Sequence, residues 1–450
     1  MKWPIRILIA IALALAAAIA LPSFISLDRY IPELEKAVSA RLNEPVTIKS
    51  IRFGAFPLPH LTIDGIAIGS TDDIKLDRVT AIPALLSLLA STKVIRSIEI
   101  DALVLTKKAV DRIPEWTRPD AEQQAQQPPQ VRVERIVLNR ALLTLDKTAV
   151  GPFDARITLD SEGAVGDASF ATLDGKLKAL LKPEGPNYLI EASAKAWTMP
   201  VGPPVLFDEL TIKGIATRND ADLGDISAKL YGGTANGKVN VKWQKGLQVH
   251  GNFAISQMEL VHIAPLLSSG THVSGRLNAK PAFSAAGSAE NFVESLRLET
   301  PFDVQHGVIH GVDIEKAATS LIKQGATGGE TRFEKLSGHL VMERRAFRFT
   351  QLKIASGELG VDGNVDISPG KELVGRIHAQ LKAMGVSTNV PLNVAGTVAS
   401  PLLLPTGATM AGAAVGTAVM GPGVGTAVGA KVGGWVGDLF GGKAEKKPKK

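Results

Sequence analysis

The sequence predicts a mainly β protein. It begins with an N-terminal transmembrane helix and continues as an elongated, curved antiparallel β-sheet shaped like a groove. A few short helices interrupt the sheet, and a glycine-rich helical hairpin follows it. Three observations predict this architecture: a charge-free apolar run at the start, alternation of apolar and polar residues through the middle, and glycine at every fourth position near the end. The 450 residues allow several domains or one repetitive architecture.

Residues 1–27 predict a membrane anchor. From Ile7 to Ile25 no residue is charged, which gives 19 residues, against the roughly 20 that a helix needs to cross the apolar core of a bilayer. Lys2 and Arg6 precede this run, so the basic side is expected in the cytoplasm and the rest of the chain across the membrane. The alternative is a cleaved signal peptide, because residues 18–20 (Ala-Ile-Ala) resemble a cleavage site. Both interpretations export the body of the protein.

Residues 28–116 are predicted to form an N-terminal module that starts with an amphipathic helix. Apolar residues at helical spacing give this helix one apolar face: Ile31, Leu34, Val38 and Leu42. The helix is expected to lie just outside the bilayer or to cap the first strands, and the two interpretations are compatible. Residues 117–130, rich in Gln and Pro, are predicted to be a mobile linker.

Residues 131–404 are predicted to be a β-repeat groove body. Apolar residues such as Val239 and Val241 alternate with polar residues here, and the same alternation runs along 359–367 and 373–381. It also occurs earlier, at 98–104. This pattern is typical of strands with one apolar and one wet face. Short helices are expected at 84–92, 260–269 and 312–324.

A short motif, apolar-x-Gly-x-apolar-x-apolar, recurs along the chain. Its copies begin at Leu173, Ala235, Val249, Val273, Leu336, Val361 and Leu373, with a truncated copy at Val394. Each glycine is expected on the apolar face of its strand. The glycines are either points of curvature in an ordinary packed sandwich, or small residues that keep a concave face open for an apolar ligand. The second interpretation gives these candidate lipid-facing residues: Gly237, Val239, Val241, Gly251, Phe253, Gly275, Leu277, Gly338, Leu340, Val361, Gly363, Val365, Ile367, Gly375, Ile377 and Gly396.

The sequence gives little support for catalysis. Ser320 and Lys323 form an S-x-x-K string without its usual partner motifs. His306 and His310 would lie about 13 Å apart in a strand, which is too far to share a metal ion. The chain has no Cys, which excludes disulfides, zinc–thiolate sites and a cysteine nucleophile. We therefore predict that the protein is not an enzyme, and we expect no catalytic residue, cofactor or metal site.

The charge distribution argues against nucleic acid as a partner. The net charge is +6, and the tail 443–450 (KAEKKPKK) carries five Lys and one Glu, so most of the net charge lies in this basic tail. The rest of the chain is close to neutral and lacks the basic surface that nucleic acid requires.

Two parts of the chain resemble the AsmA family of Gram-negative envelope proteins. In the first part, 28–110, the resemblance rests on Tyr30, the helix to Leu42, Pro45-Val46, Phe56-Pro57-Leu58-Pro59 and Leu61 to Gly65. In the second part, 330–405, it rests on the run from Leu336 to Leu381 and on VPLNVAGTVASP (390–401), which resemble the C-terminal AsmA-like region. Residues 131–330 are similar to the family only in their general sequence pattern.

The resemblance implies a single-pass protein of the cell inner membrane with its bulk in the periplasm. It also implies a long β-groove that is apolar inside, as in bridge-like lipid carriers, and membrane phospholipids as partners. We expect the protein to assist phospholipid transport and outer-membrane assembly or homeostasis. The alternative is an envelope scaffold that transports nothing, or a regulator of outer-membrane protein assembly, with envelope proteins as partners. The chain is short for the family, which puts a complete bridge across the periplasm in doubt.

Residues 405–442 predict a helical hairpin that associates with a membrane. They are rich in Gly and Ala, and Gly421-Pro422-Gly423 would break a helix. Lys431 and Asp438 argue against a deep span. The alternatives are a hairpin that closes the end of the groove and a flexible tail. The basic tail is expected at lipid headgroups. The candidate residues for close helix packing are Gly412, Gly416, Gly425, Gly429, Gly433 and Gly437.

Overall fold

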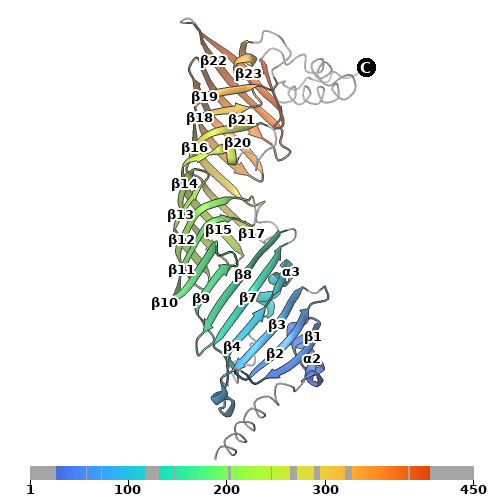
Figure 1. Cartoon of the computed structure of the whole chain (residues 1–450). Helices are drawn as coiled ribbons and strands as arrows, with labels where there is room; N and C mark the ends of the chain where they lie inside the picture. The colour runs from blue at the N-terminus through green and yellow to red at the C-terminus, as the bar shows by residue number, and fades with distance from the viewer. Residues whose placement is uncertain are drawn as a thin grey trace, which may run out of the picture. The chain divides into compact units, whose positions relative to one another are not determined.

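The computed structural model of the chain (Figure 1) describes residues 27–405 except for several gaps. The gaps are 57, 72, 117–130, 146–147, 201–203, 245, 264–270, 288–293, 320–326 and 384–385. The predicted membrane helix, the linker, the glycine-rich hairpin and the basic tail lie outside the described residues. Within the described residues, no helix has both the length and the apolar character that a membrane crossing requires. The chain divides into two compact units, Met1–Arg218 (unit 1) and Asn219–Lys450 (unit 2).

Unit 1 is a curved sheet with short helices. Its helices are η2 (Asp28–Tyr30), α2 (Ile31–Leu42), η3 (Leu85–Leu89) and α3 (Lys107–Trp116). Its strands are β1 (Val46–Gly54), β2 (His60–Ile68), β3 (Ile74–Pro83), β4 (Lys93–Asp101), β5 (Val104–Thr106), β6 (Val131–Val133), β7 (Arg135–Leu145), β8 (Thr148–Leu159), β9 (Val165–Thr172), β10 (Leu177–Glu184), β11 (Asn187–Thr198) and β12 (Leu206–Ala216).

The sheet of unit 1 is antiparallel except at one junction. Strands β4 and β5 run parallel to β6 and β7. The expectation of a purely antiparallel sheet is wrong at this point. A parallel pair needs a long crossover connection, and α3 with residues 117–130 supplies the length for it. The strands on the two sides of the predicted linker therefore belong to one sheet.

The free edge of β1 is covered by the helix that precedes it. The Ile48 amide donates to Glu35 Oε1 at 2.8 Å, and the Val46 amide donates to Ser39 Oγ at 3.1 Å. Exposed edge amides invite pairing with other chains, and covering them removes that risk. The structure thus confirms the capping role expected for the amphipathic helix.

Helix α3 packs on the apolar side of the first strands. Ala109 is fully buried with Ile74, Leu76, Leu103 and Ala141 in one cluster. This helix is absent from the sequence-based expectations.

An ion pair attaches the N-terminal end of α3 to the residue before β3. Lys108 Nζ lies 2.7 Å from Asp73 Oδ2, and Thr71 Oγ1 donates to Asp73 Oδ1 at 2.6 Å. The hydrogen bonds from Lys108 and Thr71 lower the pKa of Asp73, although burial acts in the opposite direction.

Unit 2 is an antiparallel meander. Its strands are β13 (Asp220–Leu230), β14 (Gly233–Lys242), β15 (Leu247–Glu259), β16 (His272–Ala279), β17 (Ala282–Gly287), β18 (Arg297–His310), β19 (Glu330–Glu343), β20 (Ala346–Ser356), β21 (Leu359–Ile367), β22 (Leu373–Ala383), β23 (Val386–Thr397) and β24 (Ser400–Pro405). Its described helices are η4 (Leu260–His262) and α5 (Ile314–Thr319). Strands β16 and β17 both lie between β15 and β18.

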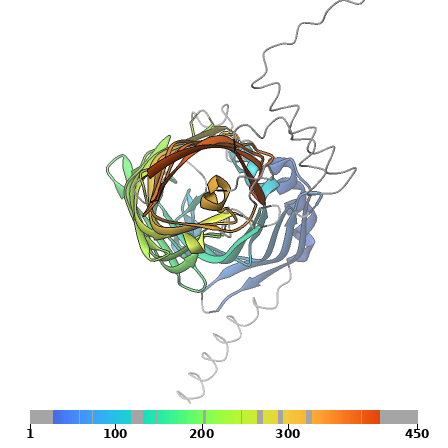
Figure 2. The same ribbon diagram turned by 90° about the horizontal axis from the view of Figure 1, so that it is seen from above.

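The core of unit 2 lies on the inner side of this meander. Figure 2 shows α5 (orange) within the curve of the unit 2 strands. Its Ile314 and Ala317 are buried against β19 and β22–β24. Leu392, which is fully buried, and Val304 belong to the same cluster.

Three strands carry a bulge that is pinned by a side chain of a neighbouring strand. The bulge residues Arg140, Gln257 and Gln351 have positive φ angles, between 53° and 56°. Their amides donate to Asp154 Oδ1, Asn278 Oδ1 and Asn364 Oδ1 at 2.8, 2.9 and 3.0 Å, respectively. A bulge bends and twists its strand and leaves one residue without a ladder partner. The Asp or Asn oxygen supplies that partner, so the bend is built in.

The observed elements match most of the sequence-based expectations. The alternating stretches at 98–104, 238–243, 359–367 and 373–381 correspond to β4 and β5, β14, β21 and β22. The helix expected at 84–92 is η3, and those expected at 260–269 and 312–324 begin as η4 and α5 and then run into residues outside the description.

Candidate functional site

Strands β7–β12 of unit 1 present one apolar face. Strand register places residues directly opposite one another in rows that cross the sheet. On this face, two neighbouring rows contain no charged residue. The first row is Leu138, Ala155, Phe170, Ala179, Ala192 and Ile212. The second row is Ile136, Ile157, Ala168, Leu181, Ile190 and Gly214. We call this surface the apolar face of unit 1.

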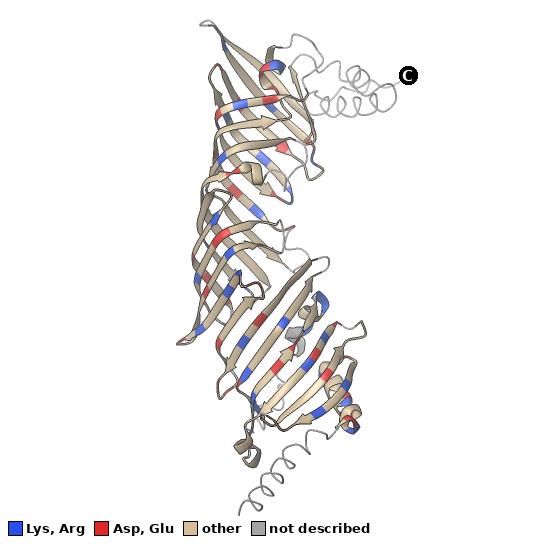
Figure 3. Ribbon diagram, viewed as in Figure 1, with Lys and Arg blue, Asp and Glu red and all other residues tan. Residues whose placement is uncertain are grey.

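The opposite face of the same strands is polar. Its row between the two apolar rows is Val137, Arg156, Ser169, Leu180, Glu191 and Lys213. Figure 3 shows Lys, Arg, Asp and Glu interspersed along the strands. The mixture of both signs hydrates the outside of the sheet without producing a surface of one sign.

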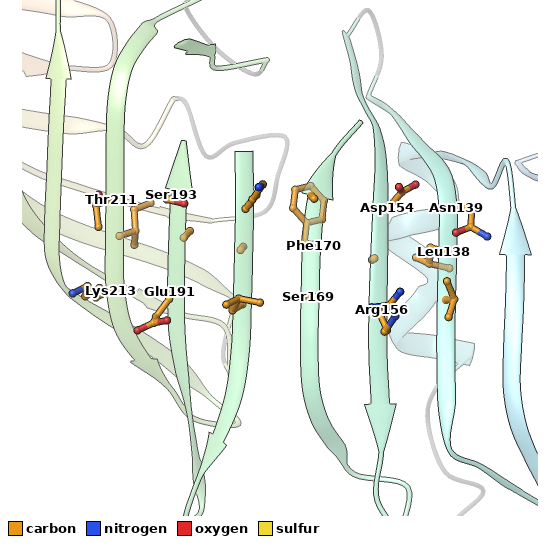
Figure 4. A pocket seen from close by; sticks show the side chains of 18 residues that line it. Leu138, Asn139, Asp154, Arg156, Ser169, Phe170, Glu191, Ser193, Thr211 and Lys213 are labelled. Carbon is orange, nitrogen blue, oxygen red and sulfur yellow. The ribbon is translucent and has the colours of Figure 1, made fainter. Parts of the chain in front are cut away.

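A hollow of about 600 Å³ lies along β7–β12 (Figure 4). Its lining includes the whole first apolar row, and it also includes the polar row named above and the charged residues Asp154 and Lys178, so the hollow is not confined to the apolar face. The ring of Phe170 packs on that of Phe153, with ring centroids 4.8 Å apart. The volume lies within the range of small-molecule and cofactor pockets.

The apolar face of unit 1 has little cover over its later strands. In the described part of unit 1, α2 packs on β1, η3 on β4 and α3 on β5 and β7, so no helix packs extensively on β8–β12. Phe170, Leu181 and Ile190 are accordingly half-buried rather than buried. Leu103 and Ala141, which lie in the α3 cluster, are buried. The later strands thus expose a continuous apolar surface.

Unit 2 presents an apolar face of the same kind. One of its rows crosses the sheet from β13 to β22 and contains no charged residue. This row is Leu223, Val239, Gly251, Phe283, Leu298, Met342, Phe347, Ile367 and Leu373. We call this surface the apolar face of unit 2.

The residues predicted to face lipid fall on this face of unit 2. Register opposes Gly237 to Phe253 and Val365 to Gly375. The remaining predicted residues of β14–β23 follow the same alternation. The structure therefore brings them together on one surface, and their contact with lipid stays a prediction.

The glycines on this face do not leave open space. A Cβ atom on Gly251 would stand 2.9 Å from Phe283 Cζ, and one on Gly237 would overlap the ring of Phe253. Rings from neighbouring strands occupy these positions, so the expectation that glycine keeps the face open is wrong there. Glycine instead makes room for a cross-strand ring. The motif glycine Gly175 lies outside any strand, in the turn between β9 and β10.

The two ends of the unit 2 face differ in burial. Around α5, Ile377 and Leu359 are buried, and Leu392 is fully covered. Here the packed-core interpretation holds. Farther along, Val239, Phe253 and Leu340 remain half-buried. One end of the face is thus closed by α5, while the other retains accessible apolar area.

The two histidines singled out in the sequence both lie in β18 but differ in their surroundings. His310 stacks on His272 at 4.5 Å between centroids, and its Nδ1 lies 3.0 Å from Glu330 Oε1, whereas His306 occupies a strand irregularity with φ of 50°. In the described part of the chain, no group of three or more His, Asp or Glu residues could hold a metal ion. Ser320 and Lys323 lie outside the described residues.

An ion cluster lies on the first strands of unit 1. Asp64 accepts hydrogen bonds from Arg52 and from Arg78, the latter at 2.8 Å. Burial raises the pKa of Asp64, but the two guanidinium groups lower it by more, so the pKa lies below its ordinary value. These partners give the cluster a structural role.

The chain matches a known protein family over its first part. The model of the AsmA family matches residues 1–185, which reach the end of β10. This match confirms the AsmA resemblance inferred from the sequence. The match does not extend to 330–405, where the resemblance stays a prediction. Searches of curated proteins and of solved structures gave no match.

Proposed function

We propose that this protein holds phospholipid acyl chains on the apolar faces of its two units and thereby assists phospholipid transport and outer-membrane assembly or homeostasis. One observation carries the proposal: uncharged rows cross β7–β12 without extensive cover by another described element. Contiguous exposed apolar surface is uncommon on soluble proteins unless it binds something.

The chemistry of the two faces fits an acyl chain. Burial of apolar surface contributes about 0.8 kcal/mol per methylene group, and no charged group in the rows opposes it. A row along many strands offers a long, unspecific track, as an alkyl chain requires. The charged outer face stays in water. The confirmed AsmA resemblance is consistent with a role in the envelope and in lipid transport.

The proposal includes anchoring in the cell inner membrane by residues 1–27, with the bulk of the chain in the periplasm. The charge-free run from Ile7 to Ile25 supports it. The glycine-rich segment 405–442 is proposed to associate with a membrane. Its deletion, together with the basic tail, should weaken vesicle binding in a chain that lacks the first span, whereas unchanged binding would reduce the segment to a tail.

A scaffold that carries no lipid is the second candidate. The observation that favours it is the closed end of unit 2, where α5 covers Ile377 and Leu392 as an ordinary core. If both apolar faces were covered by partner proteins in the cell, crosslinking from them would trap protein and no lipid.

The test is lipid retention by the full chain. The protein is extracted in mild detergent, and bound phospholipid is measured by mass spectrometry. Leu181→Glu places a charge on the apolar face, and Leu180→Glu places the same charge on the polar face one residue away. We expect bound phospholipid in the unmodified chain and in Leu180→Glu, with a strong loss in Leu181→Glu. Absence of lipid from all three would overturn the proposal.

A further inference from the structure

Five large apolar side chains stand exposed at one end of the sheet formed by β1–β4. Leu86 and Leu89 in η3 are 89% and 93% exposed, and Phe56 after β1 is 76% exposed. Leu58 and Leu85 are about half exposed. We call these five residues the apolar tip.

Register shows that the two loops of the apolar tip lie at the same end of the sheet. Gly54 pairs with His60 across the β1–β2 loop. Leu61, the next residue of β2, pairs with Ala81, close to the end of β3. Ile82 then pairs with Ser97 across the loop that contains η3. The β1–β2 loop and the β3–β4 loop therefore present their apolar side chains at the same end of the strands.

The structure holds the η3 turn in place although its leucines are exposed. Ser87 Oγ donates to Ala84 O at 2.6 Å and accepts from the Val94 amide at 2.8 Å. The Ala90 amide closes the turn on Ser87 O at 3.0 Å. The polar residue of the turn thus faces the strands. The turn that carries the exposed Leu86 and Leu89 is therefore ordered.

The chain enters unit 1 beside the second half of β1, the strand that leads into the Phe56 loop. The Leu27 amide donates to Ile51 O at 3.0 Å, and the Ile51 amide donates to Asp28 Oδ1 at 2.9 Å. Ile51 lies in the second half of β1, three residues before Gly54, the last residue of that strand. Directly before Leu27, the sequence carries the 19-residue charge-free run from Ile7 to Ile25.

Aromatic and basic side chains lie beside the entering chain and after η3. Tyr30 is 46% exposed, and the Arg29 guanidinium lies 4.8 Å from its ring centroid. Lys93, the first residue of β4 after η3, donates to Ala90 O at 2.7 Å. Aromatic and basic side chains are enriched where a protein meets lipid headgroups.

We infer that the apolar tip inserts into the headgroup and acyl boundary of the bilayer from which the N-terminal segment emerges. Exposed apolar side chains with basic and aromatic neighbours bind such surfaces by burying apolar area in the interface. The tip would fix the end of the unit 1 sheet against the membrane, as a contact additional to the first span. This site is distinct from the apolar faces of the two units.

The absence of cysteine from the chain makes the test direct. The full chain carrying Leu86→Cys is labelled with an environment-sensitive fluorophore. It is then reconstituted into vesicles of phosphatidylethanolamine and phosphatidylglycerol that contain spin-labelled lipid quenchers. The matched control is Ser70→Cys, an exposed turn residue between β2 and β3 at the opposite end of the same strands.

We expect blue-shifted emission and strong quenching by shallow lipid quenchers at position 86, with neither at position 70. Equal, water-like emission without quenching at both positions would overturn the inference. Emission at position 86 that shifts only when another envelope protein is added, without lipid quenching, would assign the tip to a protein partner and would equally overturn it. Lipid held on the apolar faces affects neither readout, because both labels lie in loops at the ends of the sheet.

Discussion

The ring of Phe253 lies over Gly237, its register partner on the neighbouring strand, where a larger residue at position 237 would place its side chain. Glycine and aromatic residues therefore act as pairs on the apolar face of unit 2. The glycine is required because of the partner ring and the adjacent Asn252 carbonyl oxygen.

Replacement of Gly237 by Ala should destabilise unit 2 by about 1–3 kcal/mol, because the added methyl group overpacks the site and must displace a ring and backbone. Hydrogen exchange of β14 and β15 in the full chain measures this effect locally. Gly224→Ala on β13 is the matched control, since nothing lies within 4 Å of its Cβ position and its φ is not positive. It should leave exchange unchanged or slow it slightly. Equal acceleration by both variants would contradict the pairing.

The Asn364 side chain should be needed for the bulge at Gln351. Asn364→Ala removes the acceptor of the Gln351 amide and should cost about 1 kcal/mol. Asn364→Asp keeps an acceptor, as Asp154 does for Arg140, and should restore most of the loss. Thermal unfolding followed by circular dichroism compares the variants. If Asp restores nothing, the side chain does not act through this hydrogen bond.

The Asp73–Lys108 pair should make the attachment of α3 sensitive to acid. The pKa of Asp73 in the folded protein is lowered from its ordinary value of 3.8, so the pair stabilises the fold fully above that value. The contribution is lost as the pH falls through the lower folded pKa. Asp73→Asn should therefore reduce stability by about 1 kcal/mol at neutral pH and by progressively less below pH 3.8. A difference in thermal midpoint that stays constant from neutral to strongly acidic pH would rule this out.

Helix α5 should be a structural closure of unit 2. Ile314→Ala empties a buried position and should cost about 2–5 kcal/mol. Lys316→Ala on the exposed side of the same helix should change stability by no more than about 0.5 kcal/mol. Hydrogen exchange of β22 and β23 measures both. Similar small effects from the two substitutions would show that α5 does not close this end.

Much of the fold could be predicted from local pattern. Alternation at Leu359–Ile367 and Leu373–Ala383 reflects strands with one wet face, and a period of two is sufficient to identify such strands. The parallel junction could not be predicted, because it depends on which strands β6 and β7 pair with, and tertiary packing decides that pairing.

The candidate site was predictable in composition but not in detail. The sequence places Gly237, Gly251 and Gly338 on an apolar face, and register agrees. It cannot show that Phe253 and Phe283 fill the space above the first two, because that depends on which strands are neighbours and in which register. The apolar rows of β7–β12 could not be predicted for the same reason. Their alanines, such as Ala179 and Ala192, become significant only when the strands are aligned.

The central claim is that the apolar face, and not the polar face, touches lipid. Leu180 and Leu181 test it most directly, because they are the same residue type, adjacent on β10, and directed to opposite faces. A photo-crosslinking amino acid is placed at each position in the full chain in cells, and adducts are identified by mass spectrometry. We predict phospholipid adducts at position 181 and none at position 180. Protein adducts alone at position 181, or equal lipid labelling at both positions, would contradict the account.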